Sequence, residues 1–423
     1  MPLDNSSQIE QTVEHLFRQE WGKLVAVLTK LFGPQNLQLA EDVVQDTLLK
    51  AFNTWKINGL PQNPTAWLFT VARNKAIDVL RQQKRQNEVS KNLTPLLQSE
   101  YSLVPTVQEL VNTNTIDDDQ LRMMFVCCHP ALSTEAQVSL ILKTLCGFNV
   151  TEIAKAFVTG YDTIEKRLTR ARQSFREHNV QFELPAATEL DSRLDNVLLA
   201  IYLLFNEGYN STQHEDLIRK DLMYEAMQLC ELICRSPAVD HFKAHALMAL
   251  ICFTASRNEA RQDADGNILL LKQQDRNKWN EALIDKGIFH LEASAPGEQV
   301  SRYQLEAGIA YEHARAGNYA STNWKNILQC YDLMCQLYPS PVVELNRAIV
   351  ISELYGPAEA IKIIEAIENL SSLKKYYLLP ATLGELHLQL QHYEQANEYF
   401  AEAIQLTSSA AEKKLLQYKM KKV

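Results

Sequence analysis

Residues 148–176 read FNVTEIAKAFVTGYDTIEKRLTRARQSFR, and the pattern predicts two short helices joined by a turn. The first helix is expected over Thr151–Phe157, Gly160 supplies the turn, and Asp162 can cap the second helix. Apolar residues recur at helical spacing along the second helix, namely Ile164, Leu168, Ala171 and Phe175. The stretch therefore predicts a helix-turn-helix motif.

The other face of the second helix is basic. From Asp162 to Arg176 the sequence has five basic and only two acidic residues, which suits a helix that lies in the major groove of DNA. The candidate DNA-binding residues are Thr163, Lys166, Arg167 and Arg170, with Arg172 and Arg176 near the border of this face. For the helix pair alone, a solvated basic face on an ordinary helix explains the pattern equally well.

Residues 39–85 predict two consecutive helices with different exposed faces. In the first, over Leu39–Trp55, the inward positions are Ala40, Val43, Val44, Thr47, Leu48, Ala51 and Trp55. The outward stripe consists of Asp42, Gln45, Asp46 and Leu49. An exposed leucine bordered by acidic residues predicts a docking surface for another protein.

The second of these helices begins with Asn63 as its cap and Pro64 at its first position. It is expected to bury Leu68, Val71, Ala72, Val79 and Leu80, and to expose Arg73, Asn74, Asp78 and Arg81. Trp55, Trp67 and Phe69 cluster near its start, and aromatic rings beside cations can stack on unpaired bases and hold phosphates. Alternatively the three rings belong to the core, an interpretation that fits Trp55 and Phe69 better than Trp67.

The composition of the 423 residues predicts a globular protein of two or three domains, because 22% of them are charged and 46% are hydrophobic. The net charge of -9 argues against a nucleic-acid partner, but residues 1–180 hold 19 basic and 19 acidic residues, so the acidic excess lies behind them. Eight cysteines without regular spacing fit a reducing cytosol. No signal peptide or membrane span is recognisable, so we expect a cytoplasmic protein without a membrane partner.

Helical periodicity runs through almost the whole chain, and only 13 Gly and 14 Pro interrupt it, so the fold class is expected to be all-α. The C-terminal part contains a repeat typical of tetratricopeptide (TPR) helix pairs. One unit has Gly384, Ala396, Phe400 and Ala403, and the same offsets recur 36 residues earlier at Ala348, Ala360, Ile364 and Ile367. A fainter third unit has Tyr331, Met334 and Pro339.

Other candidate sites are weaker, and no metal or cofactor is expected. Cys127-Cys128-His129 lacks the spacing of a zinc site, the pair Cys230 and Cys234 fits one buried helix face, and His241 and His245 lack the glutamate of a zinc protease. A further cluster forms either a small-ligand site or a salt-bridged helical junction; it consists of Arg261, Asp263, Asp265, Asp275, Arg276 and Trp279.

The front segments together resemble a known family. AEDVVQDTLLKAFNTW (residues 40–55), PTAWLFTVARNKAIDVLR (64–81), TEIAKAF (151–157) and DTIEKRLTRARQSFR (162–176) resemble conserved regions two and four of extracytoplasmic-function (ECF) sigma factors of bacterial RNA polymerase. Further back, LLFNEGYN (203–210), ADGNILLLKQQDRNKWNEALI (264–284) and SPVVELNRAI (340–349) resemble the group of these factors that carries a long C-terminal, TPR-like extension.

The resemblance implies roles for the candidate residues. Asp42, Gln45, Asp46 and Leu49 would face the clamp helices of core RNA polymerase. Arg73, Asn74, Asp78 and Arg81 would lie near the melted upstream promoter element, and Thr163, Lys166, Arg167 and Arg170 would read the distal one. The usual Val and Ser of the recognition helix are Ile164 and Lys166 here, which leaves the preferred promoter sequence open.

The predicted organisation has five parts: region 2 over 1–86, a linker over 87–118, region 4 over 119–178, a linker over 179–191, and a helical regulatory domain over 192–423. We expect a non-enzymatic initiation factor that binds core RNA polymerase and promoter DNA. Its acidic C-terminal part is expected to contact the sigma-like domains. The alternatives are a regulator that binds duplex DNA without polymerase and a scaffold built on helical repeats.

Overall fold

The computed structural model describes residues 5–85, 116–157, 159–209, 219–237, 239, 241–264, 266–297, 299–407 and 409–421. Within these ranges the secondary structure is helical, and the extended pairing consists of one isolated bridge between Gln262 and Ile268. The prediction of an all-α fold is confirmed. No helix in the described ranges is long and apolar enough to span a membrane.

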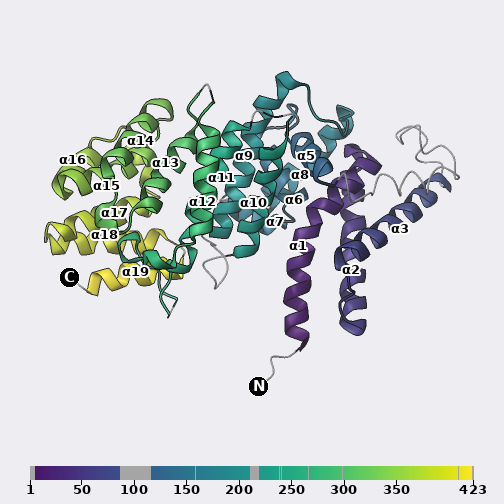
Figure 1. Cartoon of the computed structure of the whole chain (residues 1–423), viewed down its shortest axis with the longest axis horizontal. Coiled ribbons are helices and arrows are strands. Elements are labelled where there is room, and N and C mark those ends of the chain that lie inside the picture. The colour runs from purple at the N-terminus through teal and green to yellow at the C-terminus, as the bar shows by residue number, and fades with distance from the viewer. Residues whose placement is uncertain are drawn as a thin grey trace. The chain divides into compact units, whose positions relative to one another are not determined.

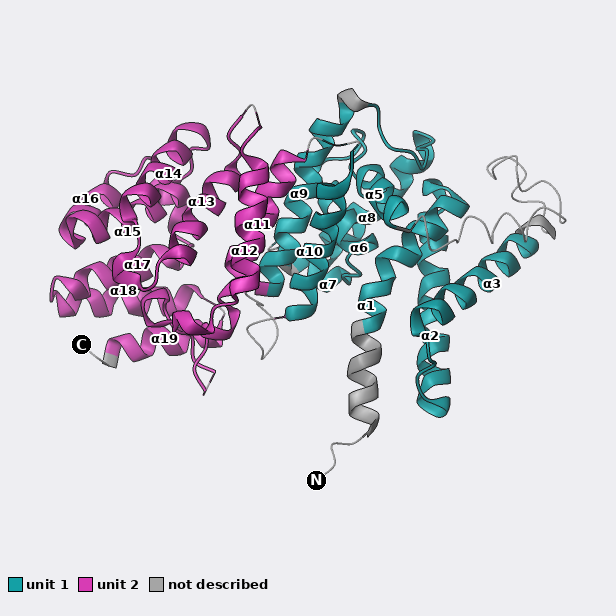
Figure 2. Ribbon diagram, viewed as in Figure 1, with its two compact units in different colours: residues 1–208, 220–240 teal, residues 209–219, 241–423 magenta. Residues whose placement is uncertain are grey.

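The chain forms two compact units (Figure 2). Unit 1 comprises Met1–Gly208 and Lys220–Asp240, and unit 2 comprises Tyr209–Arg219 and His241–Val423. The helices of unit 1 are α1 (Asn5–Phe32), α2 (Leu37–Asn58), α3 (Pro64–Arg85), α5 (Ile116–Cys127), α6 (Thr134–Thr144), α7 (Val150–Ala156), α8 (Tyr161–Glu177), α9 (Ala187–Tyr209, whose last residue belongs to unit 2) and α10 (Lys220–Arg235).

Helix α1 joins the helices of the predicted region 2 to those of the predicted region 4, because it packs on α2 and α3 as well as on α5 and α6 (Figure 1). The Trp21 indole N–H donates a hydrogen bond of 3.1 Å to the Lys143 carbonyl. Beside it a glycine is required at position 22, because a Cβ there would collide with the Leu145 carbonyl. Lys30 pairs with the fully buried Asp119 at 3.0 Å. The two predicted sigma regions thus share one core.

Helix α9 begins inside the predicted linker over 179–191 and α10 follows it, and both helices pack within unit 1. Arg193 of α9 donates a hydrogen bond of 3.2 Å to the Phe125 carbonyl, and Asn196 donates one of 2.8 Å to the Gln137 side chain. Arg18 of α1 pairs with Asp221 of α10 at 3.5 Å. Unit 1 therefore extends to Asp240, well beyond residue 178, where the predicted region 4 ends.

Unit 2 is built from successive helix pairs (Figure 1). Its helices are α11 (Phe242–Ser256), α12 (Glu281–Ser294), α13 (Arg302–Arg315), α14 (Trp324–Leu337), α15 (Pro341–Tyr355), α16 (Pro357–Glu365), α17 (Leu378–Gln389), α18 (Tyr393–Leu406) and α19 (Ala410–Lys421). Short 3-10 turns η4 (Asn258–Ala260), η5 (Leu271–Gln273) and η6 (Arg276–Lys278) lie between α11 and α12.

The positions of the two clearer predicted repeat units lie in the cores of these pairs, whereas Pro339 of the fainter third unit is exposed. In the pair α17 and α18, Gly384 is needed because a Cβ there would lie 2.7 Å from the Phe400 ring. Ala396, Phe400 and Ala403 are fully buried, as are Ala348, Ala360 and Ile364 of the pair α15 and α16. Helix pairs with small residues at the crossing are what a TPR requires, and the TPR assignment itself stays a prediction.

Candidate nucleic-acid and polymerase interface

The predicted docking stripe lies on the exposed side of α2. Asp42, Gln45, Asp46 and Leu49 are all exposed, and the leucine keeps 59% of its surface accessible. The predicted inward residues of the same helix are buried. Gln38 donates a hydrogen bond of 2.9 Å to Asp42, and Asp46 forms an ion pair with Lys75 of α3. The stripe thus combines two carboxylates with an apolar side chain that contributes little to the core.

Helix α3 starts as predicted, because the Ala66 amide donates a hydrogen bond of 3.0 Å to the Asn63 side chain ahead of Pro64. Asn74, Asp78 and Arg81 are exposed, whereas Arg73 is half-buried. Arg81 and Asp78 approach each other at 3.8 Å, one turn apart on the helix. The structure therefore places these four predicted DNA-contacting residues on one helix, with three of them open to solvent.

The aromatic residues near the start of α3 divide into two groups. Trp55 and Phe69 are buried, with 1% and 5% of their surfaces accessible, so both belong to the core. Trp67 is half-buried, and its ring lies 5.3 Å from that of Trp55 in a tilted arrangement. Of the three rings, Trp67 alone keeps a face that could stack on a base.

Helices α7 and α8 form the predicted helix-turn-helix, and Ile164, Leu168, Ala171 and Phe175 are buried as expected. The predicted cap was wrong. Helix α8 begins at Tyr161 after Gly160, which occupies the cap position without a side-chain bond. Asp162 lies inside the first turn, where its negative charge interacts favourably with the positive end of the helix dipole.

The outer face of α8 presents Thr163, Lys166 and Arg170 to solvent. Arg167 is different, because its guanidinium lies 5.1 Å from the centre of the Phe157 ring of the preceding turn. It also donates a hydrogen bond of 3.4 Å to the Ser139 hydroxyl of α6. Arg167 is therefore half-buried on the flank of the face and helps to hold α8 on its neighbours.

Sequence reasoning missed the contact between α8 and α2. Arg172 donates a hydrogen bond of 2.6 Å to Glu41 of α2, which is 1% exposed, and the Arg176 side chain donates one of 3.2 Å to the carbonyl of Gln35, in the turn just before α2. Burial raises the pKa of Glu41, while Arg172 and Lys143 act in the opposite direction. The available signals were an acidic residue beside the apolar face of α2 and two arginines at the border of the basic face.

The adjacent thiols of Cys127 and Cys128 are poor candidates for a metal site. Cys127 and Cys128 are buried side by side, and burial raises the pKa of the Cys127 thiol to about 12. A thiol that keeps its proton is a poor metal ligand, because the thiolate is the coordinating form. The ring of His245 in unit 2 lies 5.4 Å from that of His241, and its Nδ1 lies 2.7 Å from Nδ1 of His290.

The comparisons with known proteins agree with this arrangement. Residues 16–86 match Sigma-70 region 2, and residues 193–295 match a family of unknown function (DUF6596). An uncharacterized protein of Rhizobium meliloti (strain 1021) is 35% identical over 382 residues, which cover 89% of this chain and 88% of the relative. No solved structure matches the chain.

A named relative supplies the family. The ECF RNA polymerase sigma factor SigL of Mycobacterium tuberculosis (strain ATCC 25618 / H37Rv) is 30% identical over 138 residues, which cover 32% of this chain and 72% of SigL. The match of residues 16–86 to Sigma-70 region 2 agrees with this relative. The chain belongs to the ECF RNA polymerase sigma factors and carries a C-terminal extension that includes the family of unknown function.

Proposed function

We propose that this sigma factor binds core RNA polymerase through the α2 stripe, namely Asp42, Gln45, Asp46 and Leu49. The observation that carries the proposal is the exposure of all four residues on one face of α2, within the part that matches Sigma-70 region 2. An exposed leucine between carboxylates suits a basic partner surface with an apolar centre. The polymerase supplies the catalysis, and the factor itself is no enzyme.

We further propose that the factor directs the polymerase to a specific promoter. Asn74, Asp78, Arg81 and the half-buried Arg73 and Trp67 of α3 contact the melted upstream element. Thr163, Lys166, Arg167 and Arg170 of α8 read the distal element. Support comes from the cations exposed on both helices, since phosphate contacts position a protein on DNA and base contacts specify the sequence.

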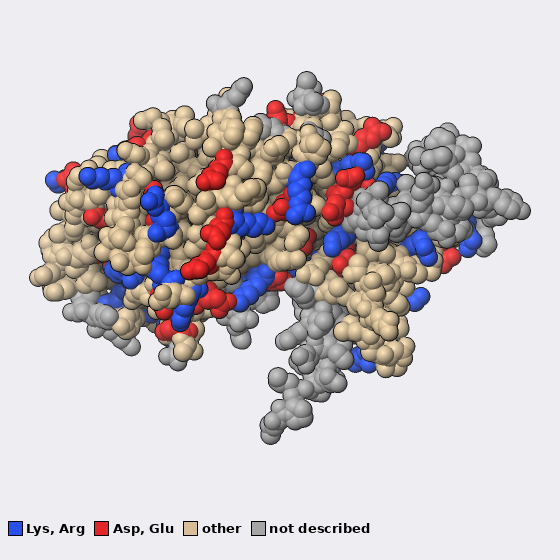
Figure 3. All heavy atoms as spheres, viewed as in Figure 1, with Lys and Arg blue, Asp and Glu red and all other residues tan. Residues whose placement is uncertain are grey.

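The C-terminal extension is proposed to regulate these activities from within the chain. In support, α9 and α10 belong to the extension and hydrogen-bond or pair with α1, α5 and α6. The acidic excess of the extension is a weaker argument, because basic and acidic side chains are interspersed on the face of the molecule drawn in Figure 3. The regulatory contact therefore rests on particular residues rather than on one acidic patch.

The experiment is a pull-down of the full chain with core RNA polymerase. Asp46→Arg is expected to weaken association by at least about tenfold, because a like charge at an interface costs several kcal/mol. Lys75→Ala is the matched control, since it breaks the same ion pair on the protein surface without placing a positive charge on α2.

Two outcomes would contradict the proposal. Absence of wild-type binding to core polymerase would leave a regulator of duplex DNA or a helical scaffold as the function. Equal binding by Asp46→Arg and Lys75→Ala, with both variants folded, would remove the α2 stripe from the polymerase interface.

A further inference from the structure

Two arginines of unit 2 converge on one tyrosine. Arg261 lies with its guanidinium 3.6 Å from the centre of the Tyr209 ring and donates a hydrogen bond to the Tyr209 carbonyl. Arg257 donates a hydrogen bond of 2.7 Å to the Tyr209 hydroxyl and lies 5.6 Å from the same ring centre. Arg261 is buried and Arg257 is half-buried, so both cationic groups meet at the end of α11.

A third arginine joins them from the following turn. Arg276 lies 3.9 Å from the Trp279 ring centre and donates a hydrogen bond of 2.9 Å to the His313 carbonyl. The turns that carry the arginines are in contact, since η4 packs against η6. Burial lowers the pKa of His313 to about 4, and the nearby charges of Arg257 and Arg276 act in the same direction. His313 is therefore neutral near pH 7, and the positive charge of the cluster comes from the three arginines.

The three charges have no acidic partner in the described part of the chain. No described carboxylate forms an ion pair with Arg257, Arg261 or Arg276. The neighbouring acidic residues accept hydrogen bonds from residues close to them in sequence. Asp263 accepts two of 2.8 Å from Asn267, and Asp275 caps η6 by accepting one from the Asn277 amide. Asp265, the other acid of the predicted cluster, lies outside the described residues. Within the described residues, the alternative of a salt-bridged junction therefore has no salt bridge to these three arginines.

The cluster also contains buried polar atoms without a hydrogen-bond partner. They are Nη2 of Arg276, Nε1 of Trp279 and Nδ1 of His313, and the tryptophan is only 6% exposed. The first two atoms can only donate, so a complementary group must accept. Buried polar groups in folded proteins normally have a partner, and an unpaired set beside uncompensated charges indicates a missing acceptor.

We infer that Arg257, Arg261, Arg276 and Trp279 form a binding site for a small oxyanion ligand, a molecule that carries a phosphate or carboxylate group. The planar guanidinium group matches both kinds of oxyanion with two parallel hydrogen bonds. The site lies within residues 193–295, which match the family of unknown function. Its residues belong to unit 2, whereas α2, α3 and α8 belong to unit 1, so the site adds a ligand to the proposed function instead of restating it.

The backbone around the site is held without the arginine side chains. The Leu269 amide donates a hydrogen bond of 2.8 Å to the Arg261 carbonyl, and Gln262 pairs with Ile268. The Asn280 amide donates one of 2.8 Å to the Ser256 carbonyl and closes the segment between α11 and α12. The arginines can therefore be replaced while the segment keeps its shape.

The test is thermal unfolding of the full chain in increasing inorganic phosphate or citrate, with sodium chloride holding the ionic strength constant. A ligand that binds the folded state raises the melting temperature in a saturable way. We expect such a rise with at least one of the two anions, and at least a tenfold weaker apparent affinity in Arg257→Gln and in Arg276→Gln. Arg302→Gln is the matched control, because it removes the same charge from an exposed ion pair of unit 2.

A second measurement separates a ligand site from a structural role. Without added anion, Arg276→Gln should melt no earlier than the wild type, because the lost hydrogen bond to the His313 carbonyl is offset by the removal of a charge that no described carboxylate compensates. A response to phosphate alone assigns phosphate compounds, and a response to citrate alone assigns carboxylates. Absence of a saturable rise with either anion, or equal affinity in the two cluster variants and Arg302→Gln, would overturn the inference.

Discussion

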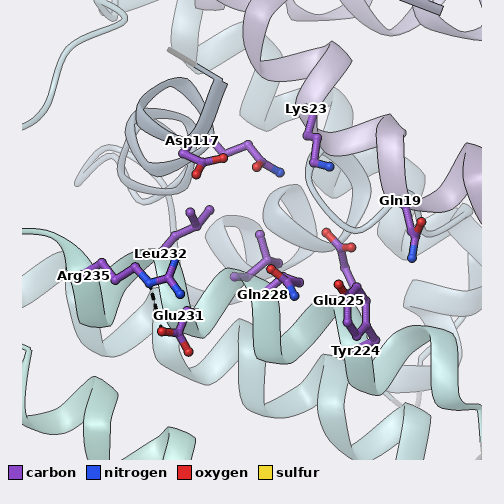
Figure 4. Close-up of a pocket in the computed structure, with 11 residues that line it drawn as sticks. Gln19, Lys23, Asp117, Tyr224, Glu225, Gln228, Glu231, Leu232 and Arg235 are labelled. Atoms are coloured by element: carbon purple, nitrogen blue, oxygen red, sulfur yellow. Dashed lines mark hydrogen bonds and ion pairs between the residues drawn. The ribbon is translucent and has the colours of Figure 1, made fainter. Parts of the chain in front are cut away.

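Glu225 of α10 is a buried carboxyl group whose ionisation opposes folding. It lines a pocket of about 180 Å³ between α1, α5 and α10, where Lys23 and Gln19 also point (Figure 4). Burial raises its pKa to about 7, an effect that Lys23 reduces and Glu20 reinforces. The folded protein therefore holds a proton on Glu225 between pH 4.5 and about 7, whereas the unfolded chain releases it near 4.5.

Because the folded state binds more protons in this window, the free energy of unfolding falls as the pH rises through it. Glu225→Gln removes this loss, so the variant should match the wild type near pH 4 and exceed it by about 3 kcal/mol at pH 8. Denaturant unfolding at a series of pH values measures the difference. The exposed Glu165→Gln is the matched control, and parallel profiles for the two variants would contradict the assignment.

Among single residues, helical periodicity predicted the exposed positions better than the buried charged side chains. Asp42, Asp46 and Leu49 could be placed outward because neighbouring positions are apolar at helical spacing. Glu41 could not be identified as buried, because its burial depends on Arg172, 131 residues away along the chain. A charged residue is usually exposed unless a partner compensates it, and a partner so distant leaves no trace in local periodicity.

Helix α8 shows that one basic face can contain arginines with different tasks. Arg170 is exposed, whereas Arg167 packs on Phe157 and bonds to Ser139. The existence of α8 and its apolar stripe were predictable from local spacing, and the cap of α3 was predictable from its Asn-Pro pair. The start of α8 was misjudged because Asp is favoured both as a cap and inside the first turn.

We expect Arg170→Ala to lower affinity for promoter DNA about tenfold without changing the melting temperature, because a single contact to a base or phosphate is worth 1–3 kcal/mol at most. Arg167→Ala should lower the free energy of unfolding by about 1 kcal/mol as well, because it removes a ring contact. DNA binding by the polymerase complex at several salt concentrations, together with thermal unfolding, distinguishes the two. Lys362→Ala, an exposed lysine of unit 2, controls for charge. Normal promoter use by both arginine variants would mean that the basic face is merely solvated.

At the scale of the whole molecule, several parts that the sequence predicted as separate domains pack together in unit 1. Linkers over 87–118 and 179–191 predicted independent domains, but α1 packs on helices from both sigma-like regions, and α9 and α10 complete unit 1. Which helices share a core depends on tertiary contacts such as Arg193 with the Phe125 carbonyl, and composition cannot supply these. The repeat positions of unit 2 were predictable because their contacts are local, within one helix pair.

The division into units determines where the chain should be cut to test regulation. A fragment of residues 1–185 lacks α9, whose Leu194, Val197, Leu198 and Ile201 are buried, whereas a fragment of residues 1–240 keeps α9 and α10. Losing this apolar burial is expected to lower the melting temperature of the shorter fragment by about 5–10 °C relative to the longer one. Circular dichroism melts of both fragments measure the difference, and equal melting would contradict the placement of α9 and α10 in unit 1.

Transcription is then compared between the full chain and residues 1–240. Higher activity of the fragment means that the rest of the extension masks the sigma surfaces, and lost activity of a folded fragment means that it supports them. A fragment that matches the full chain in polymerase binding, promoter choice and response to growth conditions would contradict regulation by the part of the extension beyond residue 240.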